Sequence, residues 1–114
     1  MKTKEELETE YALLKAKHKT IWTLDVSLDE DADGNDIEPR TYFLRKIDRI
    51  VYSAAMSFIS KDKTLDAVET VLRNLSIGGD DIAELLKSDS AIIALQNPII
   101  KVLVGSKEAK LKKN

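Results

Sequence analysis

The chain has 114 residues and a formal net charge of −2, and a chain of this length builds one domain, which here would span residues 1–114. Because 43% of the residues are hydrophobic and basic and acidic residues nearly balance, the composition is typical of a folded protein and gives no basic surface for a nucleic acid partner. The chain has no cysteine, so disulfides, thiolate metal ligands and thiol nucleophiles are excluded.

The first expected element is a charged helix within residues 1–19. The string Thr3-Lys4-Glu5-Glu6 has the form of a capping box, in which the Thr hydroxyl and the Glu carboxylate bind free N–H groups at a helix start. The apolar positions that follow form only a narrow stripe: Leu7, Tyr11 and Leu14. This pattern predicts a surface helix over residues 3–18. The segment has no apolar core of a secretory signal, which favours a cytoplasmic protein.

A β-hairpin is expected over residues 20–45. Apolar and polar residues alternate over residues 20–28, which is the period of a strand with one buried face. A second β-type run, residues 40–45, follows the turn-rich segment 29–39. The two runs predict antiparallel strands joined by a long acidic loop. The hairpin pairs either within its own chain or with the edge of a neighbouring chain.

The acidic loop matches the first half of an EF-hand calcium loop. Its oxygen ligands at positions 1, 3 and 5 of that loop are Asp29, Asp31 and Asp33. The second half fails, because Arg40 stands at position 12, where a bidentate Glu closes the metal shell. The favoured interpretation is a solvated hairpin tip whose carboxylates keep the hairpin soluble. A divalent-cation-binding module that uses these residues together with Asp36 is the alternative.

Helical periodicity begins after Lys46 and predicts a bundle over residues 46–105. The first helix presents one apolar face, made of Ile47, Ile50, Val51, Ala54, Ala55 and Phe58. After a polar break at residues 61–63, the second presents Leu65, Val68, Val71, Leu72 and Leu75. We expect Gly78-Gly79 to end it as a left-handed cap, because glycine adopts that conformation without steric cost.

Shorter helices are expected beyond the two glycines. Asp80 or Asp81 can cap the next helix, and Asp89 or Ser90 the one after it. Pro98 predicts that the last apolar helix is kinked or divided near Asn97. The fold class is therefore α+β and mainly helical: an N-terminal helix and a β-hairpin, then a bundle of four or five short helices. A polar tail over residues 106–114 completes the chain.

Residues 91–104 are apolar on nearly every side. They are too few to span a bilayer and include polar residues such as Gln96 and Lys101, so we expect no membrane contact. A surface helix in so small a domain should show a polar face. Either the segment is the central buried element, or part of it is an exposed patch for a partner or a sister subunit. The candidate partner-binding residues are Ile92, Ile93, Ile99, Ile100 and Leu103.

No pattern typical of catalysis is found in the sequence. The single histidine, His18, has no nucleophile or orienting carboxylate near it in the chain, and no nucleophile-elbow string is present. Gly78-Gly79 lacks the Lys and Ser or Thr of a phosphate loop. We therefore expect a protein that is not an enzyme, needs no cofactor, and works by binding another protein.

Three strings resemble the tail assembly chaperones of long-tailed bacteriophages and prophages, small proteins encoded near the tape-measure gene. Tyr42-Phe43-Leu44-Arg45-Lys46 is similar to an aromatic-Arg-Lys string of several such families, and residues 74–81 are similar to their Asn-x-x-x-Gly-Gly-acidic turn. Residues 104–113 are similar to their Lys-Glu-Ala-rich ending. The likeness covers roughly Trp22 to the C-terminus. It departs from the pattern at Ile47, where the families usually have proline, and in the extra N-terminal helix.

The resemblance implies a non-enzymatic chaperone in the host cytoplasm. Such a protein coats the long helical tape-measure protein, keeps its apolar stripes from aggregating, and recruits tail-tube subunits before it leaves the assembly. The resemblance also implies a homo-oligomer. Binding of a partner helix in a groove of the C-terminal helices is compatible with this role. Besides the cation-binding module, a self-assembling minor structural subunit is the alternative.

Overall fold

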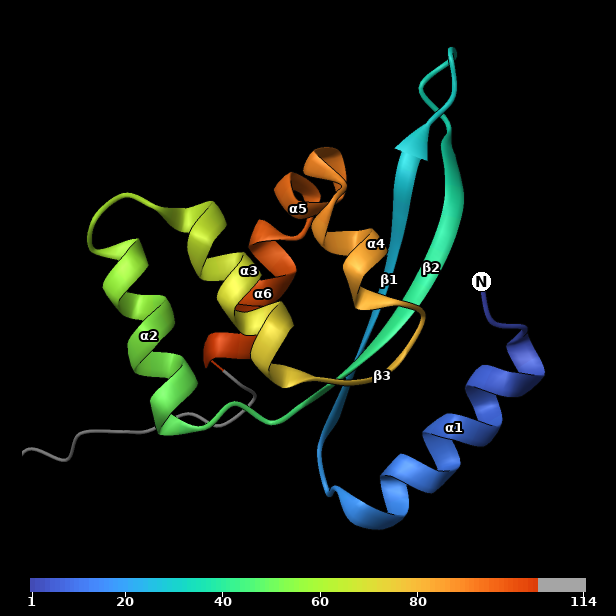
Figure 1. Cartoon of the computed structure of the whole chain (residues 1–114), viewed down its shortest axis with the longest axis horizontal. Helices are drawn as coiled ribbons and strands as arrows, with labels where there is room; N and C mark the ends of the chain where they lie inside the picture. Colours follow the sequence, from blue (N-terminus) through green and yellow to red (C-terminus); the bar gives the residue numbers. More distant parts are fainter. Residues whose placement is uncertain (105–114) are drawn as a thin grey trace, which may run out of the picture.

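The computed structural model describes residues 1–104 of the chain. The helices and strands follow in the order α1 (Lys4–Lys17), β1 (Ile21–Glu30), β2 (Asp36–Arg45), α2 (Arg49–Ile59), α3 (Thr64–Leu75), β3 (Ser76–Gly79), α4 (Ile82–Leu86), α5 (Asp89–Ala94) and α6 (Gln96–Val104). The strands form one antiparallel sheet, so the predicted class, α+β and mainly helical with an N-terminal helix and a hairpin, is confirmed (Figure 1). The predicted polar tail lies outside the described residues.

Helix α1 begins with the capping box that the sequence predicts. The backbone N–H of Glu6 donates to Oγ1 of Thr3, and the N–H of Thr3 donates to the Glu6 carboxylate, both at 3.2 Å. None of its residues is buried, which confirms a surface helix. α1 packs on the sheet through Tyr11, whose ring centroid lies 5.6 Å from that of Phe43.

Strands β1 and β2 pair with each other over their full length, beginning with Ile21 opposite Arg45. The hairpin therefore forms within its own chain, which decides the question that the sequence leaves open. The long loop predicted over residues 29–39 is wrong, because only residues 31–35 lie between the strands.

The turn between the strands is short because it satisfies its own polar groups. Oδ1 of Asp31 accepts the backbone N–H groups of Asp33 and Asn35, both at 2.9 Å. Gly34 has φ of +81°, which a glycine adopts without steric cost. Local side-chain hydrogen bonds thus replace the longer connection that the acidic composition suggested.

A third strand, β3, stands where the sequence predicts a glycine cap. Helix α3 already ends at Leu75, and the following residues pair antiparallel with β2, with Gly78 opposite Phe43 and Gly79 opposite Tyr42. The prediction that Gly78-Gly79 caps the helix is therefore wrong. The chain returns to the sheet after two helices, and β3 becomes its second edge (Figure 1).

Both glycines lie where a neighbouring element approaches closely. A Cβ at Gly78 would lie 2.8 Å from Oε2 of Glu10 and 2.9 Å from Cδ1 of Leu14, so these side-chain ends of α1 would have to shift. Gly79 has φ of +96°, and its Cβ would overlap the carbonyl oxygen of Thr41 on β2. These contacts join residues that are distant in the sequence. Rules based on neighbouring residues therefore assign Gly78 and Gly79 to a helix cap instead.

The short helices begin at side-chain caps. Asp81 caps α4, as one of the two predicted alternatives, by accepting the N–H of Ala83 at 3.0 Å. Ser88 caps α5, so the prediction of Asp89 or Ser90 is wrong; the helix starts earlier because the Ser88 hydroxyl also bonds the sheet. The last apolar segment is divided, with Pro98 in the first turn of α6, where a missing N–H costs nothing.

Replacing Ser88 by alanine should lower the free energy of unfolding by about 1–2 kcal/mol. Its Oγ accepts the N–H of Ala91 at 3.3 Å and donates to the carbonyl of Leu28 at 2.7 Å, so the mutation removes a cap and a bond between α5 and β1. Urea denaturation measures the change. Ser90→Ala is the matched control, because that hydroxyl contacts the same carbonyl only at 3.4 Å. An equal loss in both variants would mean that the cap is not the source.

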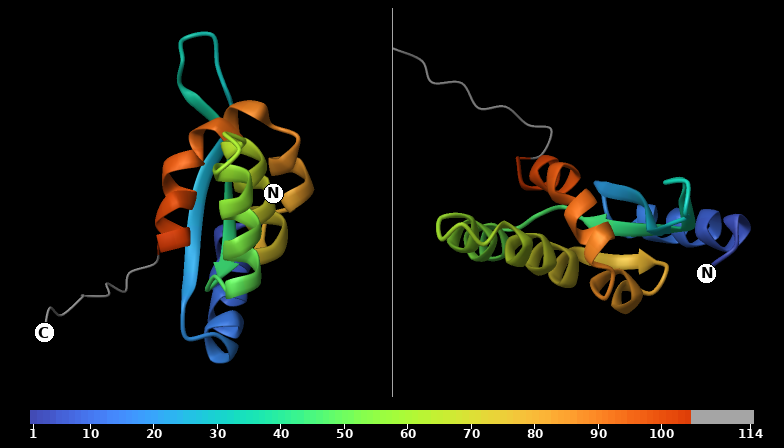
Figure 2. Two further views of the ribbon diagram at one scale, coloured as in Figure 1. Left: turned by 90° about the vertical axis from the view of Figure 1, so that its left-hand side faces the viewer. Right: turned by 90° about the horizontal axis from the view of Figure 1, so that it is seen from above.

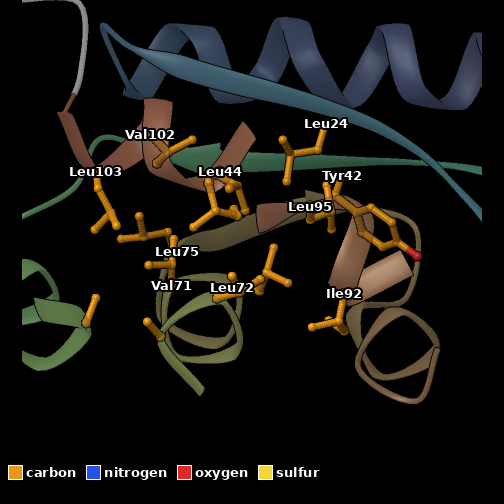
Figure 3. Close-up of a cluster of buried hydrophobic side chains, with 14 of the residues drawn as sticks. Leu24, Tyr42, Leu44, Val71, Leu72, Leu75, Ile92, Leu95, Val102 and Leu103 are labelled. Atoms are coloured by element: carbon orange, nitrogen blue, oxygen red, sulfur yellow. The ribbon is translucent and has the colours of Figure 1, made fainter. Parts of the chain in front are cut away.

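The core lies between one face of the sheet and helices α3 to α6. Its largest fully buried side chains are Tyr42, Leu44, Leu72, Leu75, Leu85, Ile99, Val68, Val71 and Val102. Figure 3 labels six of them: Tyr42, Leu44, Val71, Leu72, Leu75 and Val102. Phe43 points to the opposite face, because successive side chains of a strand alternate, and α1 covers it there (Figure 2). No helix of residues 1–104 has the length and apolar character needed to cross a membrane.

Candidate interaction surfaces

The string Gly78-Gly79-Asp80-Asp81 joins the N-terminal helix to the sheet. Asp80 is 7% exposed, and its two carboxylate oxygens accept the backbone N–H of Lys2 at 2.7 Å and that of Thr41 at 2.8 Å. Its own N–H donates to the Thr41 carbonyl at 2.8 Å. Gly79 donates to Oε1 of Glu10 at 2.9 Å. Folding therefore accounts for Gly79 and Asp80, and the exposed residue of the string, Asp81, caps α4.

The string Tyr42-Phe43-Leu44-Arg45-Lys46 is mostly internal. Tyr42, Phe43 and Leu44 are buried, with exposed fractions of 0%, 3% and 0%. Arg45 forms an ion pair with Asp48 at 2.9 Å and donates to the carbonyl of Asn74 at 3.3 Å, so it ties β2 to the ends of α2 and α3. Only Lys46 is exposed. The aromatic residues therefore form the sheet's two faces rather than a contact surface.

The five candidate partner-binding residues on α5 and α6 divide into two groups. Ile92, Ile99 and Leu103 are 4%, 1% and 7% exposed and belong to the core, so they form no surface in the folded chain. Ile93 and Ile100 are exposed. Of the two alternatives for residues 91–104, a central buried element or an exposed patch, the first therefore holds for most of the segment. The reason is that α5 and α6 fill the space between the sheet and α3.

The acidic hairpin tip does not assemble a metal site. Asp31 turns its carboxylate onto the backbone of its own turn, and these N–H donors, Asn35 first, lower the pKa of Asp31 below its ordinary value. Asp29 likewise accepts the N–H of Glu30 at 2.8 Å. Within residues 1–104, no group of three or more His, Asp or Glu side chains is arranged to hold a metal ion. Asp29, Asp31 and Asp33 therefore act as turn-forming and solvated carboxylates.

A groove of about 500 Å³ lies between the hairpin and helices α5 and α6. Carboxylates line its strand side: Asp25, Asp29, Glu30 and Asp36. Its helix side is apolar, with Ala94, Leu95 and Pro98. The cation at its edge, Arg40, is paired with Glu84 at 3.1 Å. The groove could accept a cationic group. Within it the Thr41 hydroxyl donates to the carboxylate of Asp25 at 2.7 Å.

Helix α2 carries an exposed apolar surface that is not among the residues predicted from the sequence. Only Val51 and Ala55 are buried, and α2 packs chiefly on α3 at the outer end of the molecule (Figure 1). Ile50, Tyr52 and Met56 remain 81%, 43% and 38% exposed. A signal was present, because residues 50–59 contain no charged residue at all, whereas a helix with one buried side should have a polar side opposite to it.

The exposed side of α2 has ridges and a groove. Residues four apart lie in rows along a helix, so Tyr52 and Met56 form one ridge, Ile50 and Ala54 form another, and the small side chains Ser53 and Ser57 lie between them. All six are solvent-exposed. We call them the α2 outer surface. A row of small residues between two apolar ridges is the relief into which a ridge of a second helix packs.

Comparison of the chain with protein-family models, with curated proteins and with solved structures found no match. The resemblance to tail assembly chaperones therefore stays a prediction. The α2 outer surface is the candidate binding site on physical grounds, because it exposes large apolar side chains without any structural need of this chain.

Proposed function

We propose that this protein is a non-enzymatic, cytoplasmic protein-binding module, and specifically a phage or prophage tail assembly chaperone that binds the tape-measure and tail-tube proteins. The observation that carries the binding role is the exposure of Ile50, Tyr52 and Met56 on α2. The tail-assembly role comes from the resemblance of the three sequence strings. A helical partner such as a tape-measure protein suits a surface shaped for helix packing.

The energetics support a role in binding. Moving an apolar side chain from water into an interface gains roughly 25 cal/mol per Å², or about 1.5–3 kcal/mol for a large side chain. Ile50 at 81% exposure gains almost none of this in the isolated chain. A partner helix that covers the two ridges gains this free energy for several side chains at once. The centre of a protein interface usually consists of such buried apolar side chains.

Co-expression with the large helical protein encoded nearest to the gene tests the proposal. We expect recovery of a soluble complex from an otherwise insoluble partner, and light scattering then gives its stoichiometry and any homo-oligomer. If the partner stays insoluble, the chaperone role is refuted.

The variant Ile50→Asp should abolish that complex without unfolding the chain. Ile50 lies in the first turn of α2, where a negative charge interacts favourably with the helix dipole, so we expect a melting temperature close to that of the unmodified chain. Ile93→Asp on α5 is the matched control, since Ile93 is also strongly exposed, at 54%. Equal loss of the complex with both variants would contradict a site on α2.

The two alternatives are separated by simple measurements. A cation-binding module would show heat on calcium titration, whereas the carboxylate of Asp31 is already engaged by its own turn. A minor structural subunit would remain in purified particles, where mass spectrometry detects it, and a chaperone would not.

A further inference from the structure

Helix α2 has unpaired cations at both of its ends. Lys46 and Arg49 lie at its beginning, and Lys61 and Lys63 follow its end; all four are exposed. None of them takes part in an ion pair within residues 1–104. The carboxylate at the helix start, Asp48, is occupied by Arg45 at 2.9 Å and by the N–H of Val51 at 2.9 Å.

The surface between these cations carries no compensating charge. The α2 outer surface consists only of apolar and serine side chains. In the loop that follows the helix, the two lysines outnumber the single carboxylate, Asp62. The positive end of the helix dipole adds to Lys46 and Arg49 at the beginning of α2. A partner therefore meets an apolar strip, roughly 16 Å long for this helix, with two exposed cations beyond each of its ends.

A second copy of the chain does not complement this arrangement. A parallel pairing of two α2 helices brings Arg49 of one copy next to Arg49 of the other. An antiparallel pairing brings Arg49 next to the Lys61 and Lys63 end. Either orientation juxtaposes like charges, which costs free energy and suppresses the pairing.

We propose that the α2 outer surface binds a single partner helix whose apolar stripe, about three turns long, is flanked by Asp or Glu at both ends. This inference rests on the proposed binding function and specifies the chemistry of the partner. The apolar residues of the stripe pack along Ser53 and Ser57 between the two ridges. The acidic residues at the ends of the stripe pair with Lys46 and Arg49 on one side and with Lys61 and Lys63 on the other.

A displayed library of helical peptides tests the charge requirement directly. The library fixes an apolar stripe and randomises the positions at both of its ends among Glu, Gln and Lys. Selection at low salt against the full chain should enrich Glu at both ends. Selection against the triple variant Arg49→Glu, Lys61→Glu, Lys63→Glu should enrich Lys instead, and its melting curve verifies that the variant is folded. Added salt should reduce both preferences.

The position of the site is tested with the selected peptides. They should bind Ile50→Asp at least tenfold more weakly than the unmodified chain, and Ile93→Asp equally well. No enrichment, enrichment without a charge preference, or the same preference for both targets would overturn the inference. Retained binding to Ile50→Asp would also overturn it. These outcomes leave the proposed function standing whenever co-expression still yields a soluble complex, so the two failures are distinguishable.

Discussion

Replacing Gly79 by alanine should destabilise the protein by about 3 kcal/mol or more, which is the largest effect that we expect from a single methyl group. Gly79 has φ of +96°, which strains any side chain, and the new Cβ would overlap the Thr41 carbonyl on the neighbouring strand. The backbone of β2 cannot move away without disturbing Tyr42, which is fully buried beside it. Urea denaturation followed by circular dichroism measures the loss.

Gly34→Ala separates the strain from the overlap. Gly34 also has a positive φ, +81°, but a Cβ there meets no atom within 4 Å. We expect a loss of only about 1 kcal/mol for this variant, from strain alone. Equal losses at the two positions would show that the contact between β3 and β2 leaves room for a methyl group at Gly79.

Replacing Tyr42 by phenylalanine should stabilise the protein by about 1 kcal/mol at neutral pH. The Tyr42 side chain is fully buried, and its hydroxyl finds no hydrogen-bond partner among residues 1–104. A buried hydroxyl without a partner loses its hydration and gains nothing in return. Removing it spares that cost and leaves the packing of the ring intact. A variant that is less stable than the unmodified chain would indicate that the Tyr42 hydroxyl has a hydrogen-bond partner other than residues 1–104.

The advantage of Tyr42→Phe should grow in alkaline solution. Burial, and then the negative charges of Asp80 and Glu84, raise the pKa of Tyr42 from 10.0 to about 12. The folded state therefore keeps the phenol neutral where the unfolded chain ionises, so stability is intact below pH 10 and is lost as the pH rises toward 12. Between pH 8 and pH 11 the difference between the two proteins should widen by about 1.4 kcal/mol.

Denaturation curves at several alkaline pH values measure this change. Tyr52→Phe is the control, because it removes the same hydroxyl from a side chain that is 43% exposed. A parallel pH dependence for the unmodified chain and Tyr42→Phe would contradict a shifted pKa for Tyr42.

The elements with a clear local signal were predictable from the sequence. The alternation that starts at Trp22 identified β1, and Thr3 with Glu6 identified the start of α1, because capping and strand period are local properties. The hairpin turn was predicted too long, since an acidic stretch resembles a loop even when Asp31 closes a tight turn. Composition alone does not show which carboxylate bonds the backbone.

The features that depend on distant contacts were not predictable. The strand β3 pairs with β2 where Gly79 lies against the backbone of Thr41, and no residue near it in the sequence indicates this contact. For a similar reason, the candidate binding site was predicted on residues 91–104 instead of on α2. Residues 91–104 and residues 50–59 are both apolar, but the arrangement of the helices buries most of the first segment and leaves much of the second exposed. Which of two apolar helices remains uncovered is decided by packing.

The bond between Lys2 and Asp80 has a consequence for how the chain folds during synthesis. The hairpin pairs residues near in sequence, so it can form as soon as both strands have left the ribosome. Helix α1 is made first but lacks its hydrogen bonds to the sheet until the segment with Gly79 and Asp80 follows, because the N–H of Lys2 and the carboxylate of Glu10 bond there. The earliest helix to be translated is therefore among the last to dock. A chain interrupted before β3 would hold α1 on the Phe43 side of the hairpin without these hydrogen bonds, and this side would then be more open to aggregation.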